Sequence, residues 1–169
     1  FVIHYQWGAI NTDVGYAEAK LDTVTFNGQK TFRCVAVGKT TRFFDLFFKV
    51  REDFRSYFTC DGLRPMKFTR DTHEGGYEAR NTYLYDWKAA DPHIDATVYT
   101  SKAGEMSYEI PLTPCTFDLP ALFYFARNMD FDAVEPGKRY PMTFAIDEEV
   151  FNVYFILYGR ETIKVKGFG

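Results

Sequence analysis

Apolar and polar residues alternate along much of this chain. From Val14 to Thr25, every second side chain of the central segment is apolar and those between are charged, as in Ala17-Glu18-Ala19-Lys20-Leu21-Asp22. A period of two is typical of a β-strand with one face buried and the other in water. Asn27-Gly28 then supplies residues that adopt positive φ in a tight turn, and the alternation resumes from Phe32. We therefore predict a β-hairpin over this segment.

The same alternation returns at intervals of about ten residues through most of the remaining chain. Short turn sequences separate the predicted strands: Cys60-Asp61-Gly62, Glu74-Gly75-Gly76 and Lys102-Ala103-Gly104. The strands cover 54–59, 65–72, 77–87, 94–98, 106–110, 140–146 and 151–157. Sequential short strands joined by turns predict a mainly β fold, an antiparallel meander that forms a curved sheet or an open barrel.

Two segments break the alternation and predict one or two short helices packed against the sheet. Asp118-Leu119-Pro120 combines a capping carboxylate with a proline in the first turn, and helical spacing then continues to Asp130. The phenylalanine cluster at 43–48 predicts one or two further helical turns. The strand at 151–157 is apolar on both faces, which predicts cover on each side. The helix at 118–130 is the candidate cover that plugs or lids the sheet.

The chain shows no repeat or linker, so residues 1–169 are predicted to form a single domain. Its start lacks a signal-peptide pattern, and it stops in a strand-like segment, from which we expect a trimmed or incomplete portion of a longer protein. Lys164 and Lys166 resemble charges that blunt an edge strand, and the acidic segment 147–149 predicts a solvated turn.

Charge and cysteine content exclude some functions and leave others open. The chain has 20 Lys and Arg against 23 Asp and Glu, a net charge of −3, which gives no general electrostatic case for binding nucleic acid. No apolar run approaches the roughly 18 residues that a transmembrane helix needs. Cys34, Cys60 and Cys115 form no C-x-x-C pair and leave at least one thiol free, so the redox compartment stays undetermined.

Two acid–histidine clusters are candidates for chemistry. On an extended strand, Asp91, His93 and Asp95 would project from one face about 6–7 Å apart, and such side chains can ligate zinc or another transition metal. Asp71 and His73 would share another strand face, where a carboxylate could orient an imidazole as a general base. A polar strand face beside a turn explains both clusters without a site. We therefore expect no catalytic residue, no metal, no cofactor and no enzymatic activity.

Aromatic residues make up 19% of the chain. Large rings fill wide spaces inside a curved sheet, which is the structural explanation. The alternative is that part of this surface lines a groove for an apolar or carbohydrate ligand, because binding pockets are mostly apolar and rich in aromatic side chains. The rings that we assign to such a ligand site are Phe43, Phe44, Phe47, Tyr83, Tyr85, Trp87 and Phe123.

Several segments are similar to a known family. They are Tyr5-Gln6-Trp7-Gly8-Ala9-Ile10, Val14-Gly15-Tyr16-Ala17-Glu18-Ala19, Thr41-Arg42-Phe43-Phe44, Lys49-Val50-Arg51-Glu52, Ser56-Tyr57, Leu63-Arg64-Pro65 and Glu74-Gly75-Gly76-Tyr77. This pattern resembles bacterial exported proteins of the domain of unknown function three-one-zero-eight, common in Bacteroides-like organisms. The resemblance implies a periplasmic or cell-envelope location, reached through a signal sequence absent here. It carries over no catalytic residue, because the family has no established activity.

Three functions fit these observations. The first is a non-catalytic binding module of the cell envelope that holds an apolar, lipid-like ligand against the curved sheet. The second is a structural or interaction domain that docks another envelope protein through a sheet edge or exposed rings. The third is a metal-dependent hydrolase using Asp91, His93 and Asp95. The expected partners are an apolar small molecule or an envelope protein, without nucleic acid and without a transmembrane segment in this chain.

Overall fold

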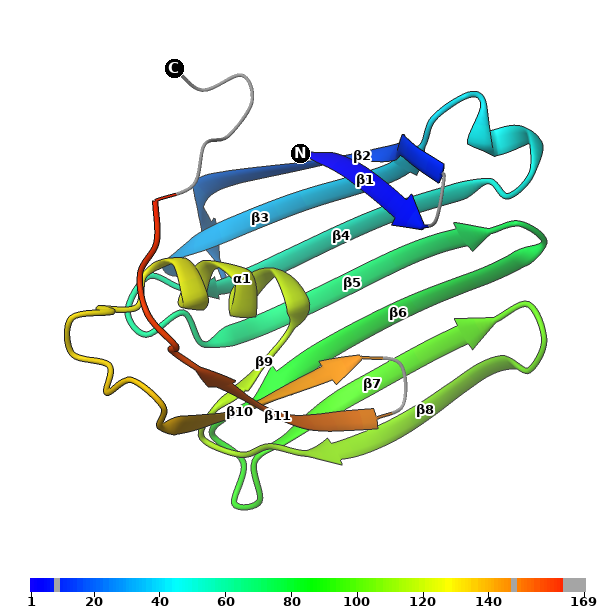
Figure 1. Ribbon diagram of the computed structural model, residues 1–169. Helices are drawn as coiled ribbons and strands as arrows, with labels where there is room; N and C mark the ends of the chain where they lie inside the picture. The colour runs from blue at the N-terminus through cyan, green and yellow to red at the C-terminus, as the bar shows by residue number, and fades with distance from the viewer. Residues whose placement is uncertain (8–9, 147–148, 163–169) are drawn as a thin grey trace.

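The computed structural model describes residues 1–7, 10–146 and 149–162. Eight strands form one antiparallel sheet in chain order (Figure 1): β1 (Val2–Trp7), β2 (Ile10–Phe26), β3 (Gln29–Thr40), β4 (Val50–Thr59), β5 (Pro65–Glu74), β6 (Tyr77–Asp86), β7 (His93–Thr100) and β8 (Gly104–Pro111). A second sheet has the order β11 (Glu149–Ile156), β10 (Arg139–Ile146) and β9 (Thr116–Phe117). The predicted mainly β meander is confirmed.

The predicted turns form where the backbone needs positive φ. Asn27 and Gly28, at φ 49° and 77°, connect β2 to β3, whose alternating residues pair in register from Gly15 with Thr40 to Phe26 with Gln29. Gly75, at φ 60°, turns β5 into β6. A Cβ at Gly75 would lie 3.0 Å from the ring of Phe48, so this position is restricted by space as well as by φ.

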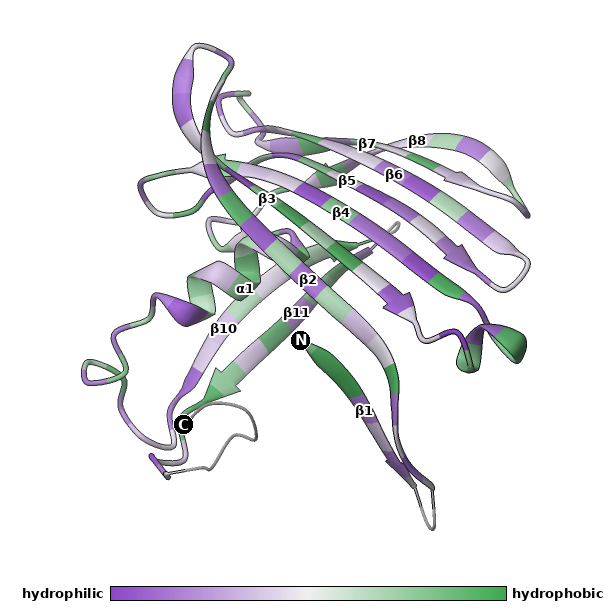
Figure 2. Cartoon of the chain, turned by 90° about the horizontal axis from the view of Figure 1, so that it is seen from above, coloured by the Kyte–Doolittle hydropathy of each residue, from purple (hydrophilic) through white to green (hydrophobic). Residues whose placement is uncertain are grey.

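The large sheet is curved and open. β1 and β8 are its two edges among the described residues, and no pairing joins them. Figure 2 shows β1 and β2 bending toward the side that carries α1 (Leu119–Arg127), β10 and β11. The ring of Phe1, just before β1, lies 6.1 Å from that of Phe123 on α1. We call the sheet face toward α1 the inner face and the opposite face the outer face.

The core consists of two apolar clusters on the inner face. One is covered by the second sheet and centres on Phe68, Tyr83, Ile94 and Val98, with Ala145 from β10. The other is covered by α1, and its buried residues are Cys34, Phe58, Leu63, Phe117 and Ala121. Alternation places charged side chains such as Asp53 and Asp71 on the outer face, because neighbouring residues of a strand point to opposite sides. The inner face also carries a largely buried ion pair, between Arg70 and Glu52 at 3.2 Å.

The helix begins where its capping carboxylate predicts. The Asp118 carboxyl accepts the Ala121 amide at 2.8 Å and the Ser56 hydroxyl at 2.6 Å, which joins the start of α1 to β4. The helix ends at Arg127 rather than near Asp130, because Asn128 caps it by donating its side-chain amide to the Tyr124 carbonyl at 2.8 Å. Within the described residues, no helix combines the length and apolar character that crossing a bilayer requires.

The phenylalanine cluster forms a short helical segment as predicted, a single 3-10 turn, η1 (Phe44–Leu46). Another detail differs from the sequence-based expectations. The prediction that the strand at 151–157 is covered on each side is wrong, because Phe151 and Tyr154, which point to opposite faces of β11, are 39% and 53% exposed. The acidic turn predicted at 147–149 falls mainly on 147–148, and the edge charges predicted at 164 and 166 also lie outside the described residues.

Candidate functional site

An apolar groove separates the C-terminal half of α1 from one end of the inner face. Its volume is about 900 Å³, within the usual range for small-molecule sites. The sheet side is lined by Leu21, Phe32 and Phe58, and the turn between β4 and β5 adds Cys60, Gly62 and Leu63. The opposite wall consists of Tyr124, Phe125, Arg127, Asn128, Met129, Asp130 and Ala133.

Strand register and the β4–β5 turn place the sheet side of this groove. Phe32 pairs with Phe58 across β3 and β4, and their ring centroids are 5.9 Å apart. Leu63 adopts φ 54°, which is uncommon for a residue with a side chain, and its side chain is buried in the cluster beneath α1. Tyr124 of α1 faces Phe58 with ring centroids 6.1 Å apart. The groove is therefore a gap between packed rings.

Burial raises the pKa of two ionisable groups beneath α1. Burial raises the pKa of Asp118 to about 7, against the opposing hydrogen bonds from Ser56 and the Ala121 amide. Burial also raises the pKa of the Cys34 thiol to about 11, and the nearby Asp118 carboxyl adds to this shift. A thiol with such a pKa stays protonated near neutrality and is a poor nucleophile.

The rim of the groove is polar. The Arg127 guanidinium lies 5.4 Å from the centroid of the Phe123 ring, and Asp130 accepts the backbone amide of Asp132. Arg127, Asn128 and Asp130 thus surround the end of α1 with hydrogen-bonding groups. An apolar floor with a few polar groups at its edge suits a ligand with an apolar body and a polar end.

The seven rings predicted to bind a ligand lie in three separate places. Phe43, Phe44 and Phe47 lie at η1, Phe123 is 39% exposed on α1, and Tyr83 is fully buried in the core. The other two pack together nearby: Tyr85 is 9% exposed, and Trp87 stacks on it at 6.2 Å while donating its indole N–H to the Pro65 carbonyl at 2.6 Å. None of the seven lines the apolar groove.

Sequence reasoning missed the groove residues themselves. Phe32 and Phe58 resemble ordinary inward-facing strand residues, and only their pairing across β3 and β4 places them together. Phe125 and Met129 are four residues apart, which indicates one helix face but does not identify the surface it meets.

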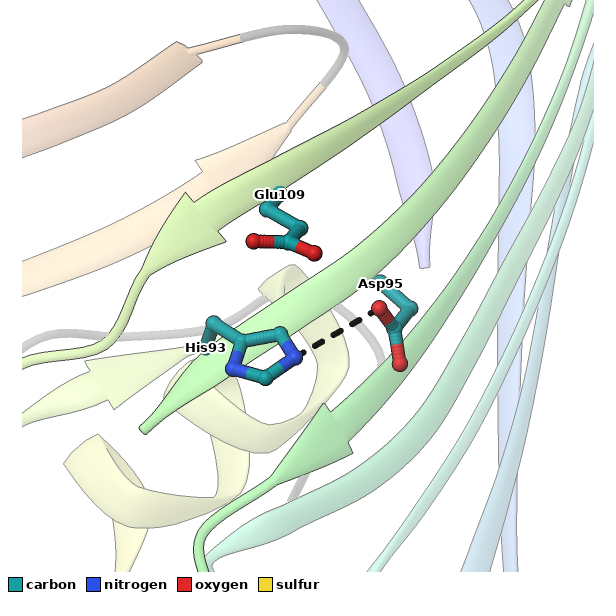
Figure 3. Close-up of side chains that lie close together, drawn as sticks. All are labelled: His93, Asp95 and Glu109. Atoms are coloured by element: carbon teal, nitrogen blue, oxygen red, sulfur yellow. Dashed lines mark ion pairs between the residues drawn. The ribbon is translucent and has the colours of Figure 1, made fainter. Parts of the chain in front are cut away.

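The second cluster with possible chemistry lies on the outer face of β7 and β8. Figure 3 shows the side chains of His93 and Asp95 on β7 beside that of Glu109 on β8. Their possible ligand atoms all lie within 4.8 Å of one another. His93 Nε2 is 3.5 Å from Asp95 Oδ1. Cross-strand pairing of Asp95 with Glu109 supplies the second carboxylate, rather than Asp91 as the sequence suggested.

Asp91 contributes through its backbone instead. Its carbonyl lies 2.8 Å from His93 Nδ1, and this hydrogen bond, with smaller contributions from nearby carboxylates, raises the pKa of His93 above its ordinary value. The bond orients the ring so that Nε2 faces the carboxylates, an arrangement that could hold a divalent cation. Asp95 and Glu109 are exposed, and exposed acidic pairs of this kind are equally suited to binding water.

The remaining acid–histidine pair shares one strand face, as predicted, and that face is the outer one. Asp71 Oδ1 is 3.3 Å from His73 Nδ1, and Glu78 approaches the other ring nitrogen at 3.7 Å. These residues border an open groove of about 960 Å³ whose lining includes Asp53 and Arg80. Among the described residues, neither a serine nor a cysteine lines this groove, and its threonine hydroxyl groups are those of Thr69 and Thr82.

The fold and the groove define the class of this protein: an open antiparallel meander whose inner face is covered by a helix and a small second sheet. The chain belongs to the family described as "Protein of unknown function (DUF3108)", whose model matches residues 1–169. This is the family that its sequence resembles. No curated protein and no solved structure matches the chain.

Proposed function

We propose that this protein is a non-catalytic binding module for an apolar, lipid-like ligand. The observation that carries the proposal is the groove of about 900 Å³ between α1 and the inner face, whose floor is formed by Phe32, Phe58 and Leu63. Burying apolar ligand surface against such rings is favourable by about 25 cal/mol per Å². The Cys34 thiol beneath α1 stays protonated near neutral pH and adds no charge that would oppose an apolar ligand.

The location belongs to the same proposal. We infer that the protein acts in the periplasm or cell envelope, as expected from its resemblance to exported proteins. Fractionation of the host cells tests this inference, and recovery of the native protein only from the cytoplasmic fraction would contradict it.

Groove occupancy can be measured with a fluorescent apolar probe. The purified chain is titrated with N-phenyl-1-naphthylamine, which is then displaced with a long-chain fatty acid. Leu21→Trp places a large ring at the groove, and Val37→Trp is the matched control on the outer face, since Leu21 and Val37 are 40% and 41% exposed.

We expect the Leu21 variant to bind the probe about tenfold more weakly, because a filled groove excludes the guest, and the Val37 variant to bind like the original chain. Equal binding by all three proteins would show that the probe binds outside the groove. Native mass spectrometry of protein from its host provides an independent check. Extra mass that is lost on denaturation identifies the natural ligand class, whereas a bare mass together with no probe binding would refute the proposal.

A further inference from the structure

A second apolar surface lies at the opposite end of the sheet, and no groove explains it. The loop between β3 and β4 carries four large apolar side chains that are mostly exposed: Phe43 at 64%, Leu46 at 80%, Phe47 at 73% and Phe48 at 55%. We call residues 42–49 the aromatic tip. Figures 1 and 2 show that η1, within the tip, projects beyond the ends of the neighbouring strands. Such a concentration of exposed apolar side chains is unusual for a surface that meets only water.

The tip has a defined shape. Phe43 contacts the rings of Phe44 and Phe47, both with centroids 5.4 Å away. Backbone bonds close the 3-10 turn, with the Phe47 and Phe48 amides donating to the Phe44 carbonyl at 2.9 and 2.8 Å. The exposed rings are therefore held by the backbone in a compact projection.

An ion pair fixes the base of the tip to the sheet. Asp45 accepts two hydrogen bonds from the Arg51 guanidinium, at 2.9 and 2.6 Å, and a third from the Thr40 hydroxyl. The Thr40 hydroxyl also accepts the Val50 amide at 3.0 Å. These bonds hold the two ends of the loop together, so exposure of the rings requires no unfolding and is a property of the folded chain.

The charge around the tip differs in sign from that of the whole chain. The aromatic tip, residues 42–49, carries Arg42 and Lys49 against the single carboxylate of Asp45, a local net charge of +1 in a chain of net charge −3. Asp45 is paired with Arg51, so Arg42 and Lys49 are the cations left to face a partner. Arg42 and Lys49 flank the rings directly and are exposed. Rings flanked by cations match the boundary between the acyl chains and the headgroups of a bilayer with anionic lipids.

We propose that the aromatic tip docks this protein on the surface of an anionic lipid bilayer. Phe43, Leu46 and Phe47 enter the boundary between headgroups and acyl chains, and Arg42 and Lys49 contact lipid phosphates. A projecting apolar tip fits a fluid surface that deforms around it, whereas a protein partner would need a matching recess. This inference goes beyond the proposed ligand binding and does not depend on it, because the groove and the tip use different residues.

Vesicle sedimentation tests the inference. The purified chain is mixed with vesicles of phosphatidylglycerol and phosphatidylethanolamine, and separately with vesicles of phosphatidylcholine alone. The variant Phe43→Ser/Phe47→Ser removes two rings from the tip. Its matched control is Val37→Ser/Leu84→Ser, which removes two apolar side chains from the outer face, 41% and 47% exposed.

We expect the chain to sediment with the anionic vesicles. The double Phe variant should lower the partition coefficient about a hundredfold, roughly tenfold for each ring that no longer leaves water. Arg42→Gln/Lys49→Gln should lower the partition coefficient about thirtyfold on anionic vesicles, and added salt should also lower it. The outer-face control should bind like the original chain.

Three results would overturn the inference. The first is a chain that sediments with neither vesicle, and the second is equal loss of binding in the tip and control variants. The third is a shift to dimer that depends on Phe43 and Phe47 without vesicle binding, which would assign the tip to a second copy of the chain. The Arg42 and Lys49 variant keeps the test valid if the double Phe variant fails to fold.

Discussion

The two ends of the sheet use the same side chains in opposite ways. At the groove end, Phe58 is fully buried between Phe32 and Tyr124, and the space left beside it is concave. At the tip end, Phe47 is 73% exposed on a projection supported by Asp45 and Arg51. A concave apolar surface suits a small guest, whereas a convex one suits a surface larger than the protein. Shape, rather than residue type, separates the two proposed partners.

The carboxylates that support the two ends also differ. Asp118, beneath α1, is fully buried and meets only uncharged hydrogen-bond donors, so burial raises its pKa. Asp45, at the base of the tip, meets a guanidinium, so hydrogen bonds from Arg51 and then Thr40 lower its pKa. Protonation of Asp118 in acid therefore does not weaken the groove end, whereas the ion pair at the tip end requires Asp45 to be ionised.

The largest difference between the two ends should appear when a ring is truncated. We expect Phe58→Ala to lower the free energy of unfolding by about 3–5 kcal/mol, because it opens a cavity beneath α1. Phe47→Ala should change it by no more than about 0.5 kcal/mol, because its ring is already in water. Urea denaturation of the two variants measures both values. Similar losses would show that the tip is part of the folded core and would break the comparison.

A smaller effect should appear in the pH dependence of the groove end. The folded state holds the Asp118 proton up to about pH 7, whereas the unfolded carboxyl releases it near its ordinary pKa of 3.8. The contribution of this group to stability therefore falls as pH rises from about 4 to 7, by about 2–4 kcal/mol in total.

The variant Asp118→Asn keeps an oxygen that can accept the Ala121 amide but has no proton to lose. We expect the variant to gain stability relative to the original chain as pH rises through this window. Denaturation at several pH values measures the difference between the two proteins. A difference that stays constant from pH 4 to pH 7 would contradict the raised pKa.

The smallest effect should come from the tip carboxylate, with the opposite sign. Because the pKa of Asp45 is lowered, its ion pair stabilises the folded state above its ordinary pKa, and this contribution is lost as pH falls. Asp45→Asn should therefore destabilise the chain slightly at pH 7 and cease to do so in strong acid. The same denaturation series detects this, and Asp53→Asn is the control, because Asp53 pairs with Arg55 at 2.9 Å outside the tip.

Local patterns were sufficient to predict the large sheet and the helix. The alternation around Ala17 and the turn at Asn27-Gly28 are complete within one hairpin, and the Asp118 cap lies next to the helix it starts. The helix was also predicted to cover the sheet, and it does cover one apolar cluster, although the premise of that prediction, a strand at 151–157 covered on both faces, was wrong. These features depend on neighbours in sequence, which a single chain displays directly.

The candidate sites depend on contacts that sequence does not display. Tyr83 and Phe47 are both aromatic, but one lies at the centre of the sheet and the other on a projecting loop. Glu109 joins His93 only because β7 and β8 pair in one particular register. The groove forms only when Phe32 pairs with Phe58 and Tyr124 packs against Phe58. Tyr124 lies 66 residues after Phe58 in the sequence. Ring content alone therefore identified apolar surface without locating it.

The order of the strands has a consequence for how the protein is made. Each of the eight strands pairs with its neighbour in sequence, so the sheet can be assembled by adding one hairpin after another as the chain emerges. The helix and the second sheet that cover its inner face come after β8. A growing chain thus presents the apolar inner face, including Phe58 and Tyr83, before its own cover has been synthesised. The interval between β8 and β11 is the period in which this protein most needs protection from aggregation.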